Sequence, residues 1–338
     1  MAKKYNVAVV GATGVVGEEF LRILPERGFP LGSLKLIASQ RSAGKKIAYG
    51  EDVLEVEALS PSSFEGCDLA FISATDEISR EYAPIAAKAG AIVIDDSGVW
   101  RMDPEVPLVV PEINGDDVAN HKGILAIPNC STTPVVMTLW PLHQLNPVRR
   151  VIVATYQSVS GTGREAVEEL EAESRASLAG EAVTPHVYPH RIDFNLIPEI
   201  GSWKEDGYTS EEMKLVNETR KIMHAPEIAI AATCVRVPVF VSHSAAVFAE
   251  FERPMALEQV WEVLGCAPGV VLQDDPQASL YPQPRAAAGT DPVYVGRIRR
   301  DISHPNGIAY WVVGDNLRKG AALNAIQIAE ELIARSLI

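Results

Sequence analysis

The sequence predicts a two-domain protein, with an α/β domain built on a parallel sheet followed by an α+β domain built on a mainly antiparallel sheet. Three observations support this. The 338 residues are enough for two domains with separate cores. Short apolar runs alternate with helix-like segments in the first third of the chain, and this alternation stops after Cys130.

The first third has the pattern of a Rossmann-type domain. The expected strands are Val7–Val10, Leu34–Ser39, Asp68–Ser73, Ala91–Asp95 and Ile124–Ile127, and the expected helices are Glu18–Arg27 and Ile78–Lys88. These strand runs are rich in Val, Ile and Leu, which is typical of strands buried on both faces. Alternating β and α units of this size indicate a parallel sheet covered by helices.

After Cys130 the expected elements are of mixed type. They are the helices Thr132–Leu145, Arg164–Leu178 and Glu211–Met223 and the strands Arg149–Val159, Ala229–Val241 and Ser244–Glu252. Thr132 and Thr133 are suited to cap the first of these helices, and Pro134 suits its first turn. The last two strands are expected to pair in a mainly antiparallel sheet with one face packed on helices.

The domain boundary is expected near residue 130. Residues 1–130 would form the first domain and residues 131–316 the second. The amphipathic helix expected at Leu317–Leu337 would place residues 317–338 back on the first domain.

Charge and cysteine content narrow the class of protein. The net charge of −14 disfavours nucleic acid and acidic membrane surfaces as partners, although a local group of arginines could still bind an anionic substrate. No apolar run is long enough to cross a bilayer. The four cysteines show neither metal-ligand spacing nor a disulfide framework. We therefore expect no metal and a reducing, cytoplasmic setting.

A glycine-rich loop, Gly11-Ala12-Thr13-Gly14-Val15-Val16-Gly17, connects the first expected strand to the first helix. A chain that turns from strand to helix presents backbone N–H groups and the positive end of the helix to a pyrophosphate. The spacing is GxxGxxG rather than GxGxxG, so a turn that binds no ligand is the alternative. The strand before the loop and the helix after it favour dinucleotide binding.

The end of the second strand discriminates between cofactors. NAD sites usually have an acidic residue here for the ribose 2′-hydroxyl. This chain has Ser39-Gln40-Arg41-Ser42 instead. A guanidinium and two hydroxyls suit a 2′-phosphate, so NADP(H) is favoured. Taken alone, Arg41 could also be an ordinary solvated charge.

Cys130 lies between an expected strand and the start of an expected helix. The partial positive charge of a helix N-terminus stabilises a thiolate, and a thiolate can attack an aldehyde or acyl carbon. The alternative, a small buried apolar residue, is preferred for Cys67, Cys234 and Cys266. The thiol needs a base, and position in the sequence leaves His243, His186 and His190 as candidates.

Several ordered segments then resemble the aspartate-semialdehyde dehydrogenase family over essentially the whole chain. These segments are Gly11–Gly17, Pro128–Thr132, Tyr156–Gly161, Phe194–Pro198, Gly207–Lys214, Cys234–Ser244 and Trp311–Gly320. The resemblance implies NADPH-dependent reduction of L-aspartyl 4-phosphate to L-aspartate 4-semialdehyde and phosphate through a cysteine thioester. It also implies a homodimer or homotetramer with subunit contacts in the second domain, and a place in lysine, threonine and methionine biosynthesis.

The resemblance also assigns roles to individual residues. Cys130 would be the nucleophile and His243 the acid/base. Gln157 would orient the substrate, and Asn129 would bind phosphate or position the carbonyl. Arg236 would bind the α-carboxylate of the substrate and Glu211 its ammonium group, and Arg101 and Lys214 would hold phosphate. The expected cofactor contacts are Gly11, Thr13, Gly14, Val15, Val16, Ser39, Arg41, Ser42, Ser160, Gly161 and Asn316.

The chain departs from the family's usual pattern at a few positions. Asp96-Ser97-Gly98-Val99-Trp100-Arg101 stands where Asn-Ser-Ser-Ala-Phe-Arg is usual, Ser242 replaces a glycine, and Ser73-Ala74-Thr75-Asp76 replaces a glycine-richer loop. The Asp96 charge would weaken phosphate binding or shift nearby pKa values.

Three other functions fit the sequence less well. N-acetyl-glutamyl-phosphate reductase uses the same chemistry but lacks the Pro-Asn-Cys-Ser-Thr and Glu-Glu-Met-Lys segments found here. A glyceraldehyde-phosphate dehydrogenase would not be expected to recognise a 2′-phosphate. The presence of Cys130, Gln157, Arg236 and His243 together argues against a non-catalytic paralogue.

Overall fold

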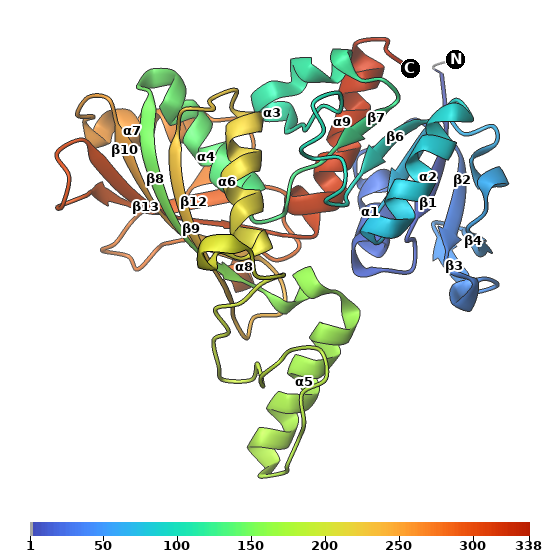
Figure 1. Cartoon of the computed structure of the whole chain (residues 1–338), viewed down its shortest axis with the longest axis horizontal. Helices are drawn as coiled ribbons and strands as arrows, with labels where there is room; N and C mark the ends of the chain where they lie inside the picture. Colours follow the sequence, from blue (N-terminus) through green and yellow to red (C-terminus); the bar gives the residue numbers. More distant parts are fainter. Residues whose placement is uncertain (1–2) are drawn as a thin grey trace. The chain divides into compact units, whose positions relative to one another are not determined.

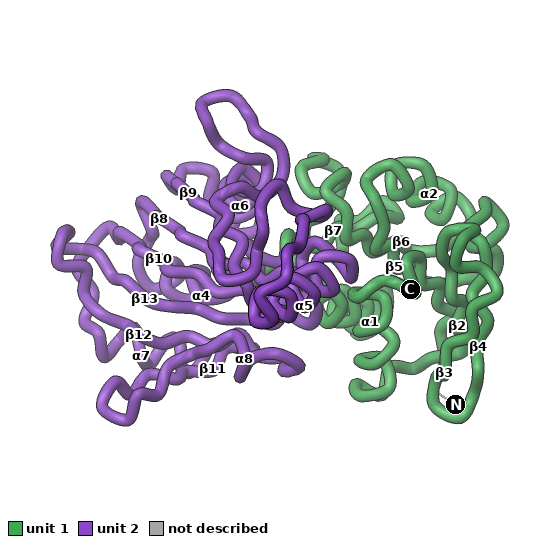
Figure 2. The backbone as a smooth tube through the Cα atoms, turned by 90° about the horizontal axis from the view of Figure 1, so that it is seen from below, with its two compact units in different colours: residues 1–129, 321–338 green, residues 130–320 purple. Residues whose placement is uncertain are grey.

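The computed structural model describes residues 3–338 and contains two compact units. Unit 1 combines the chain up to Asn129 with Ala321–Ile338, and unit 2 is Cys130–Gly320 (Figure 2). Unit 1 therefore takes its residues from both ends of the chain, and unit 2 takes its residues from the middle.

Unit 1 is built on a seven-stranded sheet of order β3-β4-β2-β1-β5-β6-β7. The strands are β1 Tyr5–Val10, β2 Leu31–Ala38, β3 Lys46–Tyr49, β4 Asp52–Ala58, β5 Leu69–Ile72, β6 Ile92–Asp95 and β7 Ile124–Ala126. All neighbours pair in parallel except β3 and β4, which form an antiparallel hairpin at one edge. The predicted parallel sheet is confirmed, and the edge hairpin was not predicted.

Helices cover both faces of this sheet. They are α1 Val15–Glu26, α2 Asp76–Lys88, α3 Pro111–Asn114 and α9 Leu323–Ala334. Phe20 of α1 and Ile326 of α9 share one apolar cluster with Val9 of β1, whereas Ala83 of α2 packs with Val10 on the opposite face. The connection after β1 goes to β2 on one side, and β5 lies on the other side. This reversal places a crevice at the carboxyl end of β1, where sheets of this type bind ligands.

Unit 2 contains a six-stranded sheet of order β11-β12-β13-β10-β8-β9. The strands are β8 Val148–Gln157, β9 Ala229–Arg236, β10 His243–Phe251, β11 Val270–Leu272, β12 Val293–Arg300 and β13 Gly307–Gly314. Pairing is antiparallel at three of the five junctions and parallel at β8–β9 and β11–β12. The mainly antiparallel sheet was predicted, but the predicted pairing of the strands at Ala229 and Ser244 is wrong, because β8 lies between β9 and β10.

Helices cover one face of the second sheet. The helices of unit 2 are α4 Thr132–Leu145, α5 Arg164–Ala179, α6 Ser210–Ile222, α7 Leu257–Cys266 and α8 Pro284–Ala287. Of these, α4, α6 and α7 pack on the sheet. The opposite face carries half-exposed apolar side chains such as Ile152 and Phe248.

Helix α5 and the irregular chain that follows it form an arm that extends away from the sheet (Figure 1). Two buried carboxylates of α5 hold this returning chain. Glu169 accepts hydrogen bonds from the backbone N–H groups of residues 186–188, and Glu173 accepts from those of Ile192 and Asp193. The arm is therefore ordered mainly by polar contacts, with a small apolar cluster at its base.

The last helix differs from the prediction at its start. The segment expected to be helical from Leu317 begins as a π-helix at Arg318–Ala322, and the regular helix α9 follows. Asn324 donates a hydrogen bond to the Val109 carbonyl inside unit 1. Within residues 3–338, no helix is both long and apolar enough to span a membrane.

Candidate active site

The glycine loop of unit 1 is tightly packed at the carboxyl end of β1. Gly11 has φ of +87°, and a Cβ there would lie 2.0 Å from the Ser73 carbonyl oxygen. At Gly17 a Cβ would lie 2.3 Å from the Gly11 oxygen. Gly14 caps α1 without any side-chain hydrogen bond. The first turn, with Val15 and Val16, thus starts at a bare helix N-terminus suited to a phosphate group.

The end of β2 adds polar groups beside this loop. Residues 40–42 form a turn of 3₁₀ helix in which the Arg41 side chain is exposed and Ser42 is buried. The Thr13 hydroxyl is 3.5 Å from the Ser42 hydroxyl, and Ser39 is exposed. The four residues therefore present a cation and hydroxyl groups next to the glycine loop.

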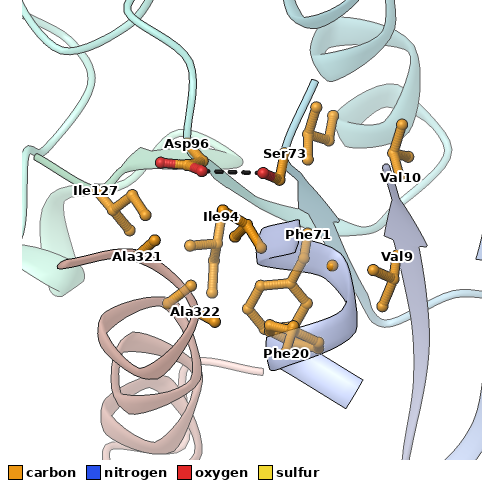
Figure 3. A pocket seen from close by; sticks show the side chains of 14 residues that line it. Val9, Val10, Phe20, Phe71, Ser73, Ile94, Asp96, Ile127, Ala321 and Ala322 are labelled. Carbon is orange, nitrogen blue, oxygen red and sulfur yellow. Dashed lines mark hydrogen bonds between the residues drawn. The ribbon is translucent and has the colours of Figure 1, made fainter. Parts of the chain in front are cut away.

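A small apolar cavity lies behind the loop, lined by side chains of β1, β5, β6 and α1 and by the start of the C-terminal helical segment (Figure 3). Its volume is about 20 Å³, enough for a single water molecule. Ser73 and Asp96 are the polar side chains in this lining, and the Ser73 hydroxyl donates to the Asp96 carboxylate over 3.0 Å.

Asp96 also holds Arg101. The buried Arg101 guanidinium donates to the Asp96 backbone oxygen over 2.7 Å and lies 3.8 Å from its carboxylate. A carboxylate beside the arginine reduces the net positive charge that a phosphate would meet. Asn129, at the end of unit 1, is also buried.

Cys130 opens unit 2, two residues before α4 begins at Thr132. The helix has the predicted bounds, but its cap is different: Ser131 is the N-cap and makes no side-chain capping bond, so the predicted threonine cap is wrong. The thiol therefore lies at a helix start whose N–H groups are not satisfied by a side-chain cap. A Cβ at Gly320 would lie 2.9 Å from the Cys130 Cβ, so this close approach requires glycine.

His243 is the histidine that contacts the thiol. Its Nε2 atom lies 3.2 Å from Cys130 Sγ, and only 1 % of the residue is exposed. Burial and the positive charge of Arg236 lower the pKa of His243 to about 3, against the opposing charge of Glu211. The ring is therefore neutral near pH 7. Of the other candidates, His186 pairs with Glu169 and His190 is exposed.

Strand direction gathers further site residues at one edge of the second sheet. Gln157 and Arg236 are register partners at the carboxyl ends of the parallel strands β8 and β9. His243 begins the antiparallel β10 and so lies at the same edge. Gly161 packs against both of these side chains, since a Cβ there would lie 3.2 Å from the His243 ring and 3.3 Å from an Arg236 nitrogen.

Helix α6 adds two charged groups to this edge. Gln157 donates to the buried Glu211 carboxylate over 3.0 Å, and Glu211 pairs with the Lys214 ammonium at 3.3 Å. Arg236 is 95 % buried, and its Nε atom has no hydrogen-bond partner among the described residues. An unsatisfied buried guanidinium nitrogen is costly, and a carboxylate ligand would satisfy it.

Ser160 and Asn316 lie in a buried polar network. The amide oxygen of Asn316 accepts from the hydroxyls of Ser158 and Ser160 and from the backbone N–H of Ser242. Ser242 has φ of +77°, a left-handed conformation that glycine adopts at less cost. The Asn316 bond to its N–H helps to hold this strained turn.

The sequence analysis missed two residues of unit 2 that contact the expected site residues. Tyr188, at the arm, places its ring 5.8 Å from the Arg236 guanidinium and donates through its hydroxyl to Thr162 over 2.9 Å. Ser158 contacts His243, Arg236 and Asn316. Ser158 follows Gln157 directly in the sequence, but nothing in a single serine indicated such contacts.

Comparisons with known proteins agree with this geometry. Residues 6–121 match the model of the semialdehyde dehydrogenase NAD binding domain, and residues 139–319 match that of the semialdehyde dehydrogenase dimerisation domain. An aspartate-semialdehyde dehydrogenase of Synechocystis sp. is 50 % identical over 99 % of both chains. The chain belongs to the aspartate-semialdehyde dehydrogenase family. It therefore has an NAD(P)-binding domain and a domain of the family's dimerisation type.

Other family members give the same picture. The aspartate-semialdehyde dehydrogenase of Bacillus subtilis is 48 % identical over the full length of both chains. Aspartate semialdehyde dehydrogenase II of Vibrio cholerae, solved complexed with ASA, superposes with a TM-score of 0.96 at 43 % identity, covering 98 % of this chain and 99 % of that one. The Candida albicans enzyme, solved with NADP, has a TM-score of 0.77 at 27 % identity, covering 99 % of this chain and 100 % of that one.

Proposed function

We propose that this chain is an aspartate-semialdehyde dehydrogenase that reduces L-aspartyl 4-phosphate with NADPH and releases L-aspartate 4-semialdehyde and phosphate. The observation that carries the proposal is the 3.2 Å contact between Cys130 and His243 at a helix start, in a chain of this family. The product would supply lysine, threonine and methionine biosynthesis in the cytoplasm.

Cys130 forms the covalent bond in this reaction. Its thiolate attacks the acyl carbon of aspartyl phosphate, the C–O bond to phosphate breaks, and a thioester remains on Sγ. NADPH would supply the hydride that reduces this thioester to a thiohemiacetal on Sγ, whose oxygen takes a proton from His243. His243 then takes that proton back as the C–S bond breaks, so that the aldehyde leaves and the Cys130 thiolate is restored. Asn129 and Gln157 would position the carbonyl group.

Substrate recognition fits the charges at the edge of the second sheet. Arg236 would pair its planar guanidinium with the α-carboxylate, and its unpartnered Nε is a donor for that purpose. Glu211 would accept the substrate ammonium group. Lys214 and Arg101 would bind the phosphate, and the Asp96 carboxylate near Arg101 would moderate that binding.

The residues of unit 1 fit NADP. The tight glycine turn and bare N-terminus of α1 would hold the pyrophosphate, where Gly11, Thr13, Gly14, Val15 and Val16 lie. Arg41, with Ser39 and Ser42, would bind the 2′-phosphate. Ser160 and Gly161 would also contact NADP. The buried Asn316 would act through Ser160, to whose hydroxyl its amide nitrogen donates.

Activity measurements can test the proposal. The purified enzyme should oxidise aspartate semialdehyde in a phosphate- and NADP-dependent reaction, and Cys130→Ala should lose at least about a thousandfold of that rate while still binding NADPH. Activity with N-acetylglutamate semialdehyde alone would instead identify an N-acetyl-glutamyl-phosphate reductase and overturn the assignment. Equal activity of Cys130→Ala would overturn the thioester mechanism.

We also propose a role for each domain. Residues 1–130 with 317–338 would bind NADP, and residues 131–316 would be the catalytic and dimerisation domain.

We propose further that the enzyme is a homodimer or a homotetramer. The uncovered face of the second sheet supports such an oligomer. Phe248 and Ile152 are register partners there, and the rings of Tyr156 and Trp311 lie 5.3 Å apart on the same face. Phe248→Asp should produce monomers in analytical ultracentrifugation, and an unchanged oligomer would contradict a contact through this face.

A further inference from the structure

Ser158 contacts the proposed site through each of its polar groups. Its carbonyl oxygen accepts from Arg236 over 2.7 Å, and its backbone N–H donates to His243 Nδ1 over 3.1 Å. Its hydroxyl lies 3.0 Å from the same Nδ1 atom and 3.1 Å from the Asn316 amide oxygen. Ser158 is fully buried, so water does not compete for these positions.

The two contacts at Nδ1 favour different states of the imidazole. A neutral ring carries one hydrogen, either on Nδ1 or on Nε2. The backbone N–H of Ser158 is only a donor, so it favours a lone pair on Nδ1 and the hydrogen on Nε2. In that tautomer Nε2 already carries a hydrogen toward Cys130 and cannot accept the proton of the thiol.

The hydroxyl of Ser158 can accept as well as donate. Its own hydrogen can point to the Asn316 oxygen at 3.1 Å, which leaves an oxygen lone pair facing Nδ1. The hydroxyl is therefore able to accept a hydrogen bond at Nδ1, and the backbone of Ser242 also favours the protonated ring. We propose that this hydroxyl accepts the Nδ1 hydrogen of His243 whenever the ring takes the proton of Cys130, which makes Ser158 a positioning residue for thiolate formation.

The proton of the thiol moves from Cys130 to His243. With the hydrogen on Nδ1 bonded to the Ser158 oxygen, Nε2 presents its lone pair to the thiol. The S–H bond of Cys130 breaks, the proton bonds to Nε2, and a thiolate–imidazolium pair results. No atom leaves the site, and the Ser158 hydroxyl keeps its own hydrogen.

The surrounding charges explain why such a partner matters. The Arg236 guanidinium beside the ring disfavours imidazolium, and the Glu211 carboxylate favours it. Burial adds a further penalty to the charged ring. A hydrogen-bond acceptor for Nδ1–H opposes that penalty in the state that carries the thiolate.

The inference rests on the proposed roles of Cys130 and His243, and the test is chosen so that it does not need substrate. The full-length enzyme is alkylated with iodoacetamide across a range of pH, and the rate at Cys130 is followed by peptide mass spectrometry. Ser158→Ala should raise the pH midpoint of Cys130 alkylation by about one unit, a tenfold change in the equilibrium. Its turnover number at neutral pH should fall by a similar factor, because less thiolate is present.

Matched variants separate the hydroxyl from general packing. Ser158→Thr retains the hydroxyl and should keep the parent midpoint, since Ser158 has extended backbone angles that suit a β-branched residue. Ser158→Cys replaces the hydroxyl with a weak acceptor and should behave like Ser158→Ala, so it serves if the alanine variant folds poorly. Thr138→Val removes another buried hydroxyl of unit 2, on α4, and should leave the midpoint unchanged. The exposed Cys266 provides an internal reference rate in every sample.

The outcomes are distinct. A parent-like midpoint in Ser158→Ala, or an equal shift in Ser158→Thr, would overturn the role of the hydroxyl while leaving the proposed reaction intact. If the parent enzyme itself shows no titration at Cys130, the proposed nucleophile falls as well. Loss of substrate activity with a normal alkylation profile would count against the proposed function alone.

Discussion

The N-terminal ends of two helices, the start of α1 and the start of α4, have the same local structure but carry different chemical groups. Helix α1 in unit 1 and α4 in unit 2 both follow a turn after a buried strand, and neither has a side-chain cap at its first residue. At α1 the turn contains Gly11 and Gly14, and the first N–H groups of the helix carry no side-chain cap, which suits a phosphate. At α4 the turn carries a thiol. The same partial positive charge is thus suited to phosphate binding in one unit and to thiolate formation in the other.

Gly11→Ala is the substitution that we expect to disrupt the turn before α1 most. The new Cβ would lie 2.0 Å from a backbone oxygen at a φ of +87°, so the loop must move. We expect loss of NADPH binding, followed by fluorescence titration, and a destabilisation of about 3 kcal/mol or more in chemical unfolding. Gly28→Ala is a control with positive φ but open space around its Cβ, and it should retain NADPH binding. Normal affinity in Gly11→Ala would show that the loop does not hold the cofactor.

The corresponding change at the second helix start is Gly320→Ala. A Cβ there would lie 2.9 Å from the Cys130 Cβ, so the thiol must shift by a few tenths of an ångström or more. We expect the turnover number to fall about 10- to 100-fold, because small displacements of a reacting group are costly, while NADPH affinity stays unchanged. A parallel loss of NADPH binding would mean that the two starts are not independent.

The second start also depends on a neutral histidine. The pKa of His243 is lowered to about 3 by burial, so the unfolded chain binds a proton near pH 6.5 that the folded chain excludes. Stability contributed by this group is therefore present above pH 6.5 and declines between pH 6.5 and 3 by up to about 1.4 kcal/mol per pH unit. In chemical unfolding, His243→Gln should lose less stability than the parent over that acid range. Identical slopes for the two proteins would contradict the neutral buried ring.

The smallest expected effect concerns cofactor choice beside the first start. Arg41 is exposed at the end of β2, so replacing it disturbs little of the fold. Arg41→Ser should raise the KM for NADPH about tenfold and leave that for NADH nearly unchanged, because only NADPH has the 2′-phosphate. Steady-state kinetics with both cofactors would measure this. Equal changes for both would assign Arg41 a role other than 2′-phosphate recognition.

The sequence predicted unit 1 better than unit 2, and the reason is physical. The strands β1, β5 and β6 are short runs buried on both faces. Helix α1 joins β1 to its neighbour β2, and α2 joins β5 to its neighbour β6, so local pattern and topology agree. In unit 2 the partners of a strand lie far along the chain: β8 pairs with β10, about a hundred residues later. Local pattern carries no signal for that pairing, and the predicted β9–β10 pair was wrong for this reason.

Much the same holds for the site. Cys130 and the glycine loop were predicted from local pattern, whereas the choice of His243 over His186 and His190 needed either the resemblance or the 3.2 Å contact. No local pattern in the sequence indicated that Tyr188 and Ser158 contact the site. The contact of Tyr188 depends on the fold of the arm, and the contacts of Ser158 depend on side chains that lie far along the chain. The four residues of the β3 strand escaped notice because they are partly exposed at the sheet edge.

The parallel direction of β8 and β9 leaves one stretch of the chain free to vary in length. Gln157 ends β8 and Arg236 ends the parallel β9, so the chain must return the full length of the sheet between them, and the arm lies in that return. Insertions or deletions in the outer part of α5 would not alter the strand register. However, the arm also carries Tyr188 against Arg236, so a shortened arm would leave the guanidinium that we propose for carboxylate binding uncovered on one side. Under the proposed function, a change in the length of the arm would thus alter the surroundings of the substrate without a change in the register of the sheet.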